Sequence, residues 1–154
     1  MTLRERITAA LKDAMKNKEA DRLSTLRLIN AAIKDRDIAL RGEGGEGQVT
    51  EADVLAILGR MVKQRQESAR AYEEGGRLEL AEKEAAEIRV IEEFLPRQLS
   101  REEVEAAIGT AIAETGASSI RDMGRVMALL KERHTGQMDF GAAGPAVKNR
   151  LSGG

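Results

Sequence analysis

Hydrophobic residues recur every three or four positions along most of the chain, which is the period of an amphipathic α-helix. No segment alternates hydrophobic and polar residues between hairpin turns, so the pattern predicts no strand. Most periodic segments begin beside a serine, threonine or aspartate that can cap a helix, or end beside a glycine. The pattern therefore predicts an all-α protein of about seven helices, over residues 2–17, 21–41, 50–75, 77–95, 100–116, 119–136 and 139–151.

The same pattern indicates which side chains should be buried. The first segment carries a stripe that repeats every four residues and consists of Leu3, Ile7, Leu11 and Met15. In the second segment, Leu28 and Ala32 widen the apolar face. Aromatic residues make up only 2% of the chain and tryptophan is absent, so the core is expected to be aliphatic.

A break in the helical pattern is predicted at Pro96. This residue lacks an N–H group and disfavours the helical conformation of the residue before it. Ser100 and Glu103 then have the spacing of a capping box, in which each side chain satisfies a backbone N–H of the other. We therefore expect two domains, an N-terminal helical bundle over residues 1–96 and a C-terminal three-helix domain over residues 97–154.

The glycine-rich segment 42–47 predicts a mobile loop, because each glycine costs roughly 1 kcal/mol relative to alanine inside a helix. It also matches the G-x-G-x-x-G spacing of dinucleotide-binding loops, but that motif follows a strand and opens a helix. Here a long helix precedes the glycines, and two glutamates among them would repel a pyrophosphate. The segment therefore favours a loop without a ligand, and we expect no cofactor.

Composition excludes several classes of function. A net charge of −1 is not the basic footprint of a typical nucleic-acid-binding domain. The absence of cysteine excludes disulfides and thiolate metal sites. The only aromatic residues are Tyr72, Phe94 and Phe140, which disfavours a protein that stacks single-stranded bases. The N-terminal segment is charged and no stretch is apolar enough to span a bilayer, which predicts a cytoplasmic protein without a membrane partner.

The chain offers little material for catalysis. His134 is the only histidine and lies near a predicted helix C-terminus, where the helix dipole favours a charged imidazole, so capping is favoured over catalysis. The glutamates of segment 82–93 are expected to form a solvated helix surface rather than a metal site. The metalloprotease, Walker and serine-hydrolase spacings do not occur. We expect no catalytic residue, no metal site and no active site in this chain alone.

Five segments, in order and at matching intervals, resemble the GatB/YqeY family in its free-standing, YqeY-like form: 25–34, 63–68, 82–84, 94–100 and 122–127. The resemblance implies a two-domain helical protein whose C-terminal domain is similar to the tail of the GatB subunit of glutamine-dependent tRNA amidotransferases, where the tail helps hold tRNA. It also implies an association with carbon–nitrogen ligase complexes that use glutamine as amido-N donor. The catalytic domain of GatB has no counterpart here. The chain departs from the family at 139–141, which leaves the shape of the last helix open.

The leading hypothesis is a non-catalytic, tRNA-binding or amidotransferase-associated protein that contacts the sugar-phosphate backbone. The candidate RNA-binding residues lie on the last two predicted helices and are Arg121, Gly124, Arg125, Lys131, Arg133, Lys148 and Arg150. The basic side chains can equally form a solvated face. Gly124 is costly inside a helix, which indicates either close helix packing or close approach of an RNA backbone.

The alternative hypothesis is a protein-interaction module that docks an amidotransferase or aminoacyl-tRNA synthetase component without touching RNA. Its candidate residues lie on the second and third predicted helices and are Arg27, Lys34, Lys63, Arg65 and Arg70. Arg27 and Arg65 lie beside apolar stripes, so pairing with glutamates at the domain interface is a structural explanation for them. An amidase or ligase activity of the chain itself is a third possibility, and glutamine-dependent ammonia release would reveal it.

Overall fold

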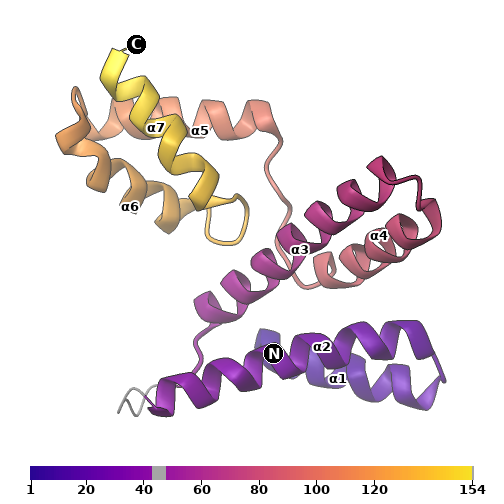
Figure 1. Ribbon diagram of the computed structural model, residues 1–154. Helices are drawn as coiled ribbons and strands as arrows, with labels where there is room; N and C mark the ends of the chain where they lie inside the picture. The colour runs from indigo at the N-terminus through magenta and orange to yellow at the C-terminus, as the bar shows by residue number, and fades with distance from the viewer. Residues whose placement is uncertain (43–47, 154) are drawn as a thin grey trace. The chain divides into compact units, whose positions relative to one another are not determined.

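The computed structural model describes residues 1–42 and 48–153. Within these residues the chain forms seven α-helices, one 3₁₀ turn and no strand, which confirms the predicted all-α class (Figure 1). The chain separates into two compact units, Met1–Pro96 and Arg97–Gly154, and the boundary lies at the predicted break. That each unit folds as a domain of its own stays a prediction.

Two expectations concern segments between or within helices. The predicted glycine-rich loop lies outside the described residues except for Gly42, which ends a helix. None of the helices in the described part of the chain combines the length and the apolar composition that a membrane span requires.

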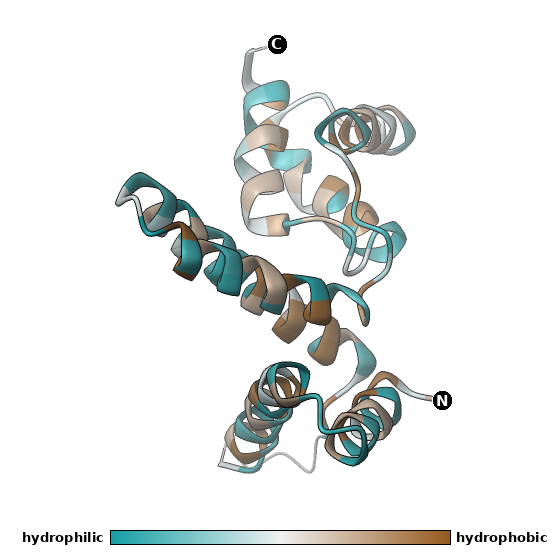
Figure 2. Ribbon diagram, turned by 90° about the vertical axis from the view of Figure 1, so that its right-hand side faces the viewer, coloured by the Kyte–Doolittle hydropathy of each residue, from teal (hydrophilic) through white to brown (hydrophobic). Residues whose placement is uncertain are grey.

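The N-terminal unit contains four helices, which are α1 (Leu3–Lys16), α2 (Ala20–Gly42), α3 (Glu51–Glu74) and α4 (Leu78–Glu92). α1 and α2 form one helical hairpin, α3 and α4 form a second, and α2 also packs on α4 (Figure 1). The helices carry both hydrophobic and hydrophilic residues along their length, as an amphipathic pattern requires (Figure 2). The buried core between the helices is aliphatic apart from Phe94.

Predicted caps account for the starts of two of the four helices in this unit, α1 and α3. The hydroxyl of Thr2 accepts a hydrogen bond from the backbone N–H three residues later, at 3.1 Å. Thr50 and Asp53 form a reciprocal capping box, with distances of 3.1 and 2.9 Å. The second helix differs slightly from expectation, because it begins at Ala20, one residue before the aspartate predicted to cap it.

Two predicted core positions are exposed. Met15 is 51% exposed and Ala14 is buried in its place. Each four-residue step advances about 40° beyond a full helical turn, so Met15 lies about 120° from Leu3, whereas Ala14 lies within about 20° of it. Leu28 is 45% exposed because it is about 100° from the buried Ile29 on the same helix.

The C-terminal unit contains three helices and a short turn, which are α5 (Arg101–Thr115), η1 (Ile120–Asp122), α6 (Met123–Arg133) and α7 (Phe140–Gly153). The three helices pack around a small core of Ile108, Ala111, Val126, Leu130 and Val147. α5 begins with the predicted capping box and ends at Gly116, whose φ of 66° is the left-handed conformation that suits glycine.

The sixth predicted helix is shorter than expected. Its first turn is the 3₁₀ turn η1, in which Ile120 is 47% exposed. The α-helix proper ends at Arg133 rather than near Gly136. The last helix is formed in spite of Pro145, which lies inside α7 and can donate no hydrogen bond to the preceding turn.

Candidate nucleic-acid interface

Asp122 organises the turn between α5 and α6. One carboxylate oxygen accepts hydrogen bonds from the backbone N–H groups of Ser118 and Ser119, at 2.9 and 3.3 Å. The other oxygen accepts from Arg125 at 2.6 Å, and the same guanidinium donates to the carbonyl of Thr115 at 3.2 Å. The N–H of Ser118, followed by Arg125, lowers the pKa of Asp122 below its usual value. Arg125 is therefore engaged within its own turn.

Two further candidate arginines connect their helices to α5. Arg133 forms an ion pair with Glu114. Arg150 donates a hydrogen bond of 2.9 Å to the backbone carbonyl of Glu105. A Cβ at Gly109 would lie only 3.3 Å from this guanidinium, so the glycine gives the arginine room on the surface of α5. Both arginines hold the three-helix unit together, whatever else they bind.

The other three basic candidates are exposed, and within the described part of the chain their side chains have no hydrogen bond or ion pair. They are Arg121 on η1, Lys131 on α6 and Lys148 on α7. Gly124 and Ala128 are also exposed and lie between Arg121 and Lys131 in the sequence. Successive members of this set of four are three or four residues apart, so the four residues share one face. A Cβ at Gly124 would meet nothing within 4 Å, which overturns the expectation of close helix packing there.

This arrangement leaves two small residues exposed between a cation on η1 and a cation near the end of α6. The two cations are about 15 Å apart along the helix, given a rise of about 1.5 Å per residue. Lys148 is one turn after Gly144, whose Cβ position would lie 3.7 Å from the side chain of Met123. Four residues advance about 40° beyond a full turn, so Lys148 lies within about 40° of the side of α7 that Gly144 presents to Met123. We call Arg121, Gly124, Ala128, Lys131 and Lys148 the basic face of the C-terminal unit.

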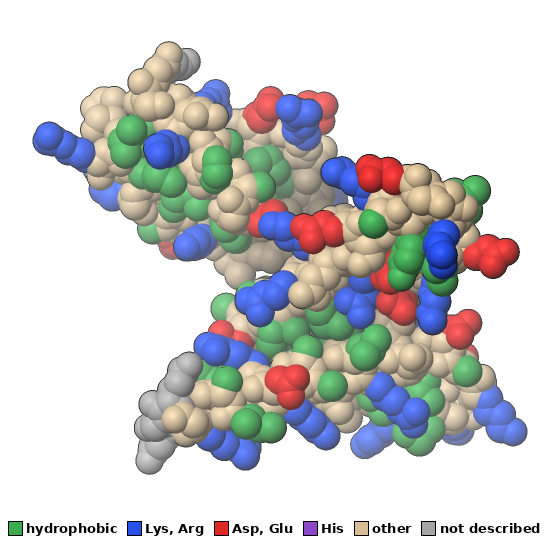
Figure 3. All heavy atoms as spheres, in the orientation of Figure 1, with side chains coloured by type: hydrophobic (Ala, Val, Ile, Leu, Met, Phe, Trp, Pro, Cys, Tyr) green, Lys and Arg blue, Asp and Glu red, His purple; other side chains and the backbone are tan. Residues whose placement is uncertain are grey.

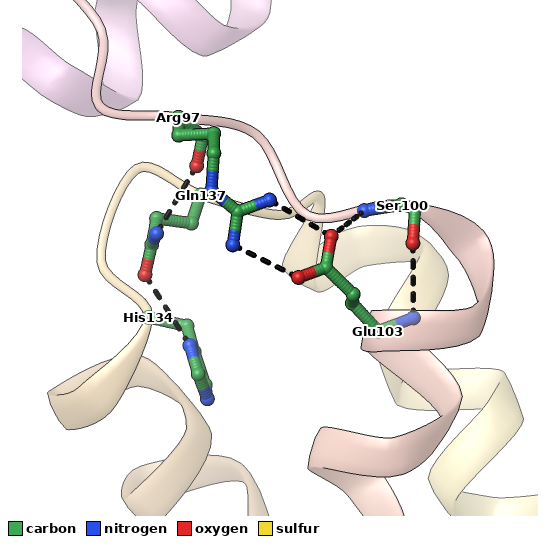
Figure 4. A network of polar contacts seen from close by, with 5 residues as sticks. All are labelled: Arg97, Ser100, Glu103, His134 and Gln137. Atoms are coloured by element: carbon green, nitrogen blue, oxygen red, sulfur yellow. Dashed lines mark hydrogen bonds and ion pairs between the residues drawn. The ribbon is translucent and has the colours of Figure 1, made fainter.

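A second polar cluster joins the start of this unit to the end of α6 (Figure 4). Arg97 forms two hydrogen bonds with the carboxylate of Glu103, at 2.9 and 2.8 Å. Arg97 and the N–H of Ser100 lower the pKa of Glu103 from 4.5 to about 2. The side chain of Gln137 donates to the carbonyl of Arg97 at 3.1 Å, and its amide oxygen lies 3.3 Å from Nδ1 of His134.

The position of His134 matches the predicted capping role, because it is the C-cap residue of α6. Its ring contacts the side-chain amide of Gln137, which also binds the carbonyl of Arg97, so we call this cluster the clasp between the end of α6 and the start of the unit. Among the described residues, no group of three histidines or carboxylates is placed to hold a metal ion.

An open groove lies beside this clasp, between α5 and α6, and encloses about 450 Å³. Its floor is formed by small and aliphatic side chains, and Arg97 and Arg133 lie at its edge. Both arginines are already paired, with Glu103 and Glu114. The sequence pattern did not predict this groove. The one feature of the sequence that could have indicated it is the group of alanines on α5, whose small side chains line the groove.

The residues of the alternative hypothesis differ in how far they are exposed. Arg65 lies between α3 and α4, where it contacts Glu87 at 2.9 Å and the carbonyl of Met61 at 3.1 Å. The two charged side chains are only 14% and 20% exposed, so Arg65 is engaged inside the N-terminal unit. The remaining candidates are exposed on α2 and α3 and are Arg27, Lys34, Lys63 and Arg70.

Comparison with known proteins places the chain in a family. The family described as Yqey-like protein matches residues 4–151, which is nearly the whole chain. An uncharacterized protein of Schizosaccharomyces pombe is 31% identical over 94 residues, which cover 61% of this chain and 72% of that protein.

A second relative, from Clavispora lusitaniae, is named "Altered inheritance of mitochondria protein 41, mitochondrial". It is 38% identical over 85 residues, which cover 55% of this chain and 46% of the relative, so this match spans less than half of that protein. The family match extends through both compact units, including the capping box of α5 and the basic face of the C-terminal unit. The chain belongs to the family of Yqey-like proteins.

Proposed function

We propose that this chain is a non-catalytic, tRNA-binding protein that acts with a tRNA amidotransferase, and that it contacts RNA through the basic face of its C-terminal unit. The observation that carries the proposal is the state of Arg121, Lys131 and Lys148, which are exposed and, in the described part of the chain, unpaired. Exposed lysine and arginine side chains bind phosphate groups, and contacts of this kind fix a protein on RNA without reading its sequence.

The small residues of the basic face support contact with a backbone rather than with bases. Gly124 and Ala128 leave the centre of the face low, so a sugar-phosphate chain can approach the helix between the two end cations. Stacking of bases needs aromatic surfaces, and the chain has only three aromatic residues. Recognition is therefore expected to follow the shape of folded RNA.

The association with an amidotransferase rests on the resemblance of the C-terminal unit to the GatB tail. A carbon–nitrogen ligase reaction with glutamine as donor would then belong to the complex and not to these residues. The proposal assumes a cytoplasmic protein. Its partners are tRNA and components of the amidotransferase.

The test is binding of unfractionated tRNA to the purified chain at about 50 and 200 mM salt. Three phosphate contacts predict that affinity falls roughly 20- to 40-fold between these concentrations. A variant with Arg121→Ala, Lys131→Ala and Lys148→Ala should bind at least tenfold more weakly at low salt and lose most of the salt dependence.

The matched control carries Lys12→Ala, Lys16→Ala and Lys83→Ala, which remove the same charge from exposed positions of the N-terminal unit. This control should bind tRNA like the unmodified chain. No binding at low salt would overturn the RNA function. An equal loss in both variants would show diffuse attraction and would overturn the proposed face.

A further inference from the structure

Several arginines of the N-terminal unit are paired with carboxylates. Four ion pairs of this kind are described, Arg4 with Asp37, Arg22 with Glu93, Arg65 with Glu87 and Arg89 with Glu82. Three basic residues of α2 differ from them, because Arg27, Lys34 and Arg41 are exposed and have no hydrogen bond or ion pair within the described residues. An exposed charge is solvated by water and needs no partner in the protein. Only the arrangement of these three side chains can therefore indicate a binding surface.

Arg27, Lys34 and Arg41 follow one another at intervals of seven residues along α2. Seven residues are nearly two helical turns, so the three side chains form a row about 21 Å long. The row lies about 100° around α2 from Leu26 and Ile33, which are buried in the core and directly precede Arg27 and Lys34. Lys and Arg side chains gather along the lower edge of the molecule, over α1 and α2 (Figure 3).

Apolar side chains accompany the basic row on the same face. Ile38 is 64% exposed and Ala31, seven residues before it, is also exposed, which makes a second row beside the first. Leu28 is 45% exposed at the far edge of the face, and Asp35 is the acidic residue among them. Exposed apolar side chains are common one at a time, so what distinguishes these is that they share a face with the basic row.

We propose that this face of α2 docks an acidic amphipathic helix of a protein partner. The face, called the α2 docking face below, consists of Arg27, Leu28, Ala31, Lys34, Ile38 and Arg41. A seven-residue repeat is the interval at which two helices packed side by side meet again. Glutamates along one edge of the incoming helix would complement the basic row, while its apolar residues would cover Ile38 and Ala31.

The apolar row distinguishes a helix from the other anionic partners. RNA could neutralise Arg27, Lys34 and Arg41, but its phosphate backbone would leave Ile38 uncovered or would bury it against charge. A membrane surface would require more than the two large apolar side chains that the face provides, and Asp35 lies among them. The combination of charge and apolar surface is the pattern by which two amphipathic helices pack side by side.

The test uses the full chain and a synthetic helical peptide of about 21 residues, with leucines at heptad spacing and glutamates beside them. The peptide should bind, as measured by fluorescence anisotropy. Reversal of the basic row by Arg27→Glu, Lys34→Glu and Arg41→Glu should weaken binding at least tenfold. A peptide with lysines in place of the glutamates should bind the reversed variant and not the unmodified chain, because the peptide is then basic and the row is acidic.

Two controls separate docking from general attraction. Ile38→Gln removes the apolar contact without changing the charge and should weaken binding roughly tenfold, whereas Met15→Gln, at a similarly exposed residue of α1, should not. Reversal of Lys12, Lys16 and Lys83 to glutamate should also leave binding unchanged. Equal effects of the test and control variants, or failure of the charge exchange, would overturn the proposal.

Other occupants give different results. Binding of anionic vesicles or tRNA that is lost in the row-reversed variant would assign the face to a membrane or to RNA and would overturn the helix. A dimer in light scattering that Ile38→Gln dissociates would identify a second copy of this chain as the occupant. Because the basic face of the C-terminal unit is unchanged in all these variants, tRNA binding through that face is tested separately.

Discussion

At the scale of single residues, pairing separates the basic side chains of the C-terminal unit into two groups. Arg125 and Arg150 donate to backbone carbonyls of α5, and Arg133 pairs with a glutamate of that helix. The side chains of Arg121, Lys131 and Lys148 have no hydrogen bond or ion pair in the described part of the chain. A cation that already holds a protein partner must exchange it to bind phosphate, so these three side chains should dominate RNA binding.

The low centre of the basic face allows a test that leaves charge unchanged. Gly124→Gln and Ala128→Gln add bulk between the two cations, and glutamine is a good helix former, so the fold should be retained. We expect tRNA affinity to fall about fivefold, equivalent to about 1 kcal/mol, the net contribution of one hydrogen bond. The salt dependence should stay the same, because no phosphate contact is removed.

The measurement is tRNA binding at two salt concentrations, as for the charge variants. Ala113→Gln, at an exposed position of α5, adds the same bulk away from the basic face and serves as the control. Undiminished binding in the Gly124→Gln and Ala128→Gln variants would show that RNA does not approach the centre of this face.

Sequence alone identified the kinds of residue in this region but not their pairing. Arg150 and its acceptor on Glu105 are 45 residues apart, and no helical spacing predicts such a contact. Arg125 is different, because Asp122 is one turn before it, and a local pair of this kind could have been anticipated. The sequence also could not predict that the surroundings of Gly124 are open, since a glycine in a helix is compatible with both packing and exposure.

At the scale of helices, local capping chemistry fixes where several elements begin. The capping boxes at Thr50 and Ser100 are formed as their spacing predicts, because both partners lie within four residues. Ile120 shows the limit of such signals. Its spacing fits the stripe of α6, but the carboxylate of Asp122 binds the two preceding backbone N–H groups, and the segment forms a 3₁₀ turn in place of an α-helical one.

Glu103 makes the start of α5 sensitive to acid. Its pKa in the folded chain is about 2, below the ordinary value of 4.5. As the pH falls, the unfolded chain therefore takes up the proton first. The stabilisation is present above about pH 4.5 and is lost as the pH falls toward about 2. We expect the thermal midpoint, followed by circular dichroism, to fall less over this range in Glu103→Gln than in the unmodified chain.

The control for this pH dependence is Glu102→Gln. Glu102 is exposed in the same first turn and has no hydrogen bond or ion pair among the described residues. This variant should follow the acid profile of the unmodified chain. If Glu103→Gln also followed it, the bond from Arg97 to Glu103 would contribute nothing to the stability of the folded chain.

At the scale of the whole molecule, the chain has two separate cores. The N-terminal core gathers residues from all four of its helices, and the C-terminal core gathers residues from the other three. Each proposed surface belongs to one unit, the α2 docking face to the first and the basic face to the second. A protein built in this way can bind two partners through surfaces that do not compete for the same side chains.

Separate cores predict separate unfolding. Ile108 is 1% exposed in the C-terminal core, and Ile108→Ala should cost about 2–5 kcal/mol. That is comparable with the whole stability of so small a unit, at about 0.05–0.15 kcal/mol per residue. In the full chain, hydrogen exchange should then show lost protection in α5, α6 and α7, while α1 to α4 stay protected.

The reciprocal variant Ile29→Ala, at a residue with 0% exposure in the N-terminal core, should reverse the pattern. Ile120→Ala, at a 47% exposed residue of the C-terminal unit, should change little. Loss of protection throughout the chain in either core variant would mean that the two units unfold as one cooperative structure. Loss confined to one unit would mean that the two units unfold independently. A substitution on one proposed surface would then leave the other surface folded, as the binding experiments on both faces require.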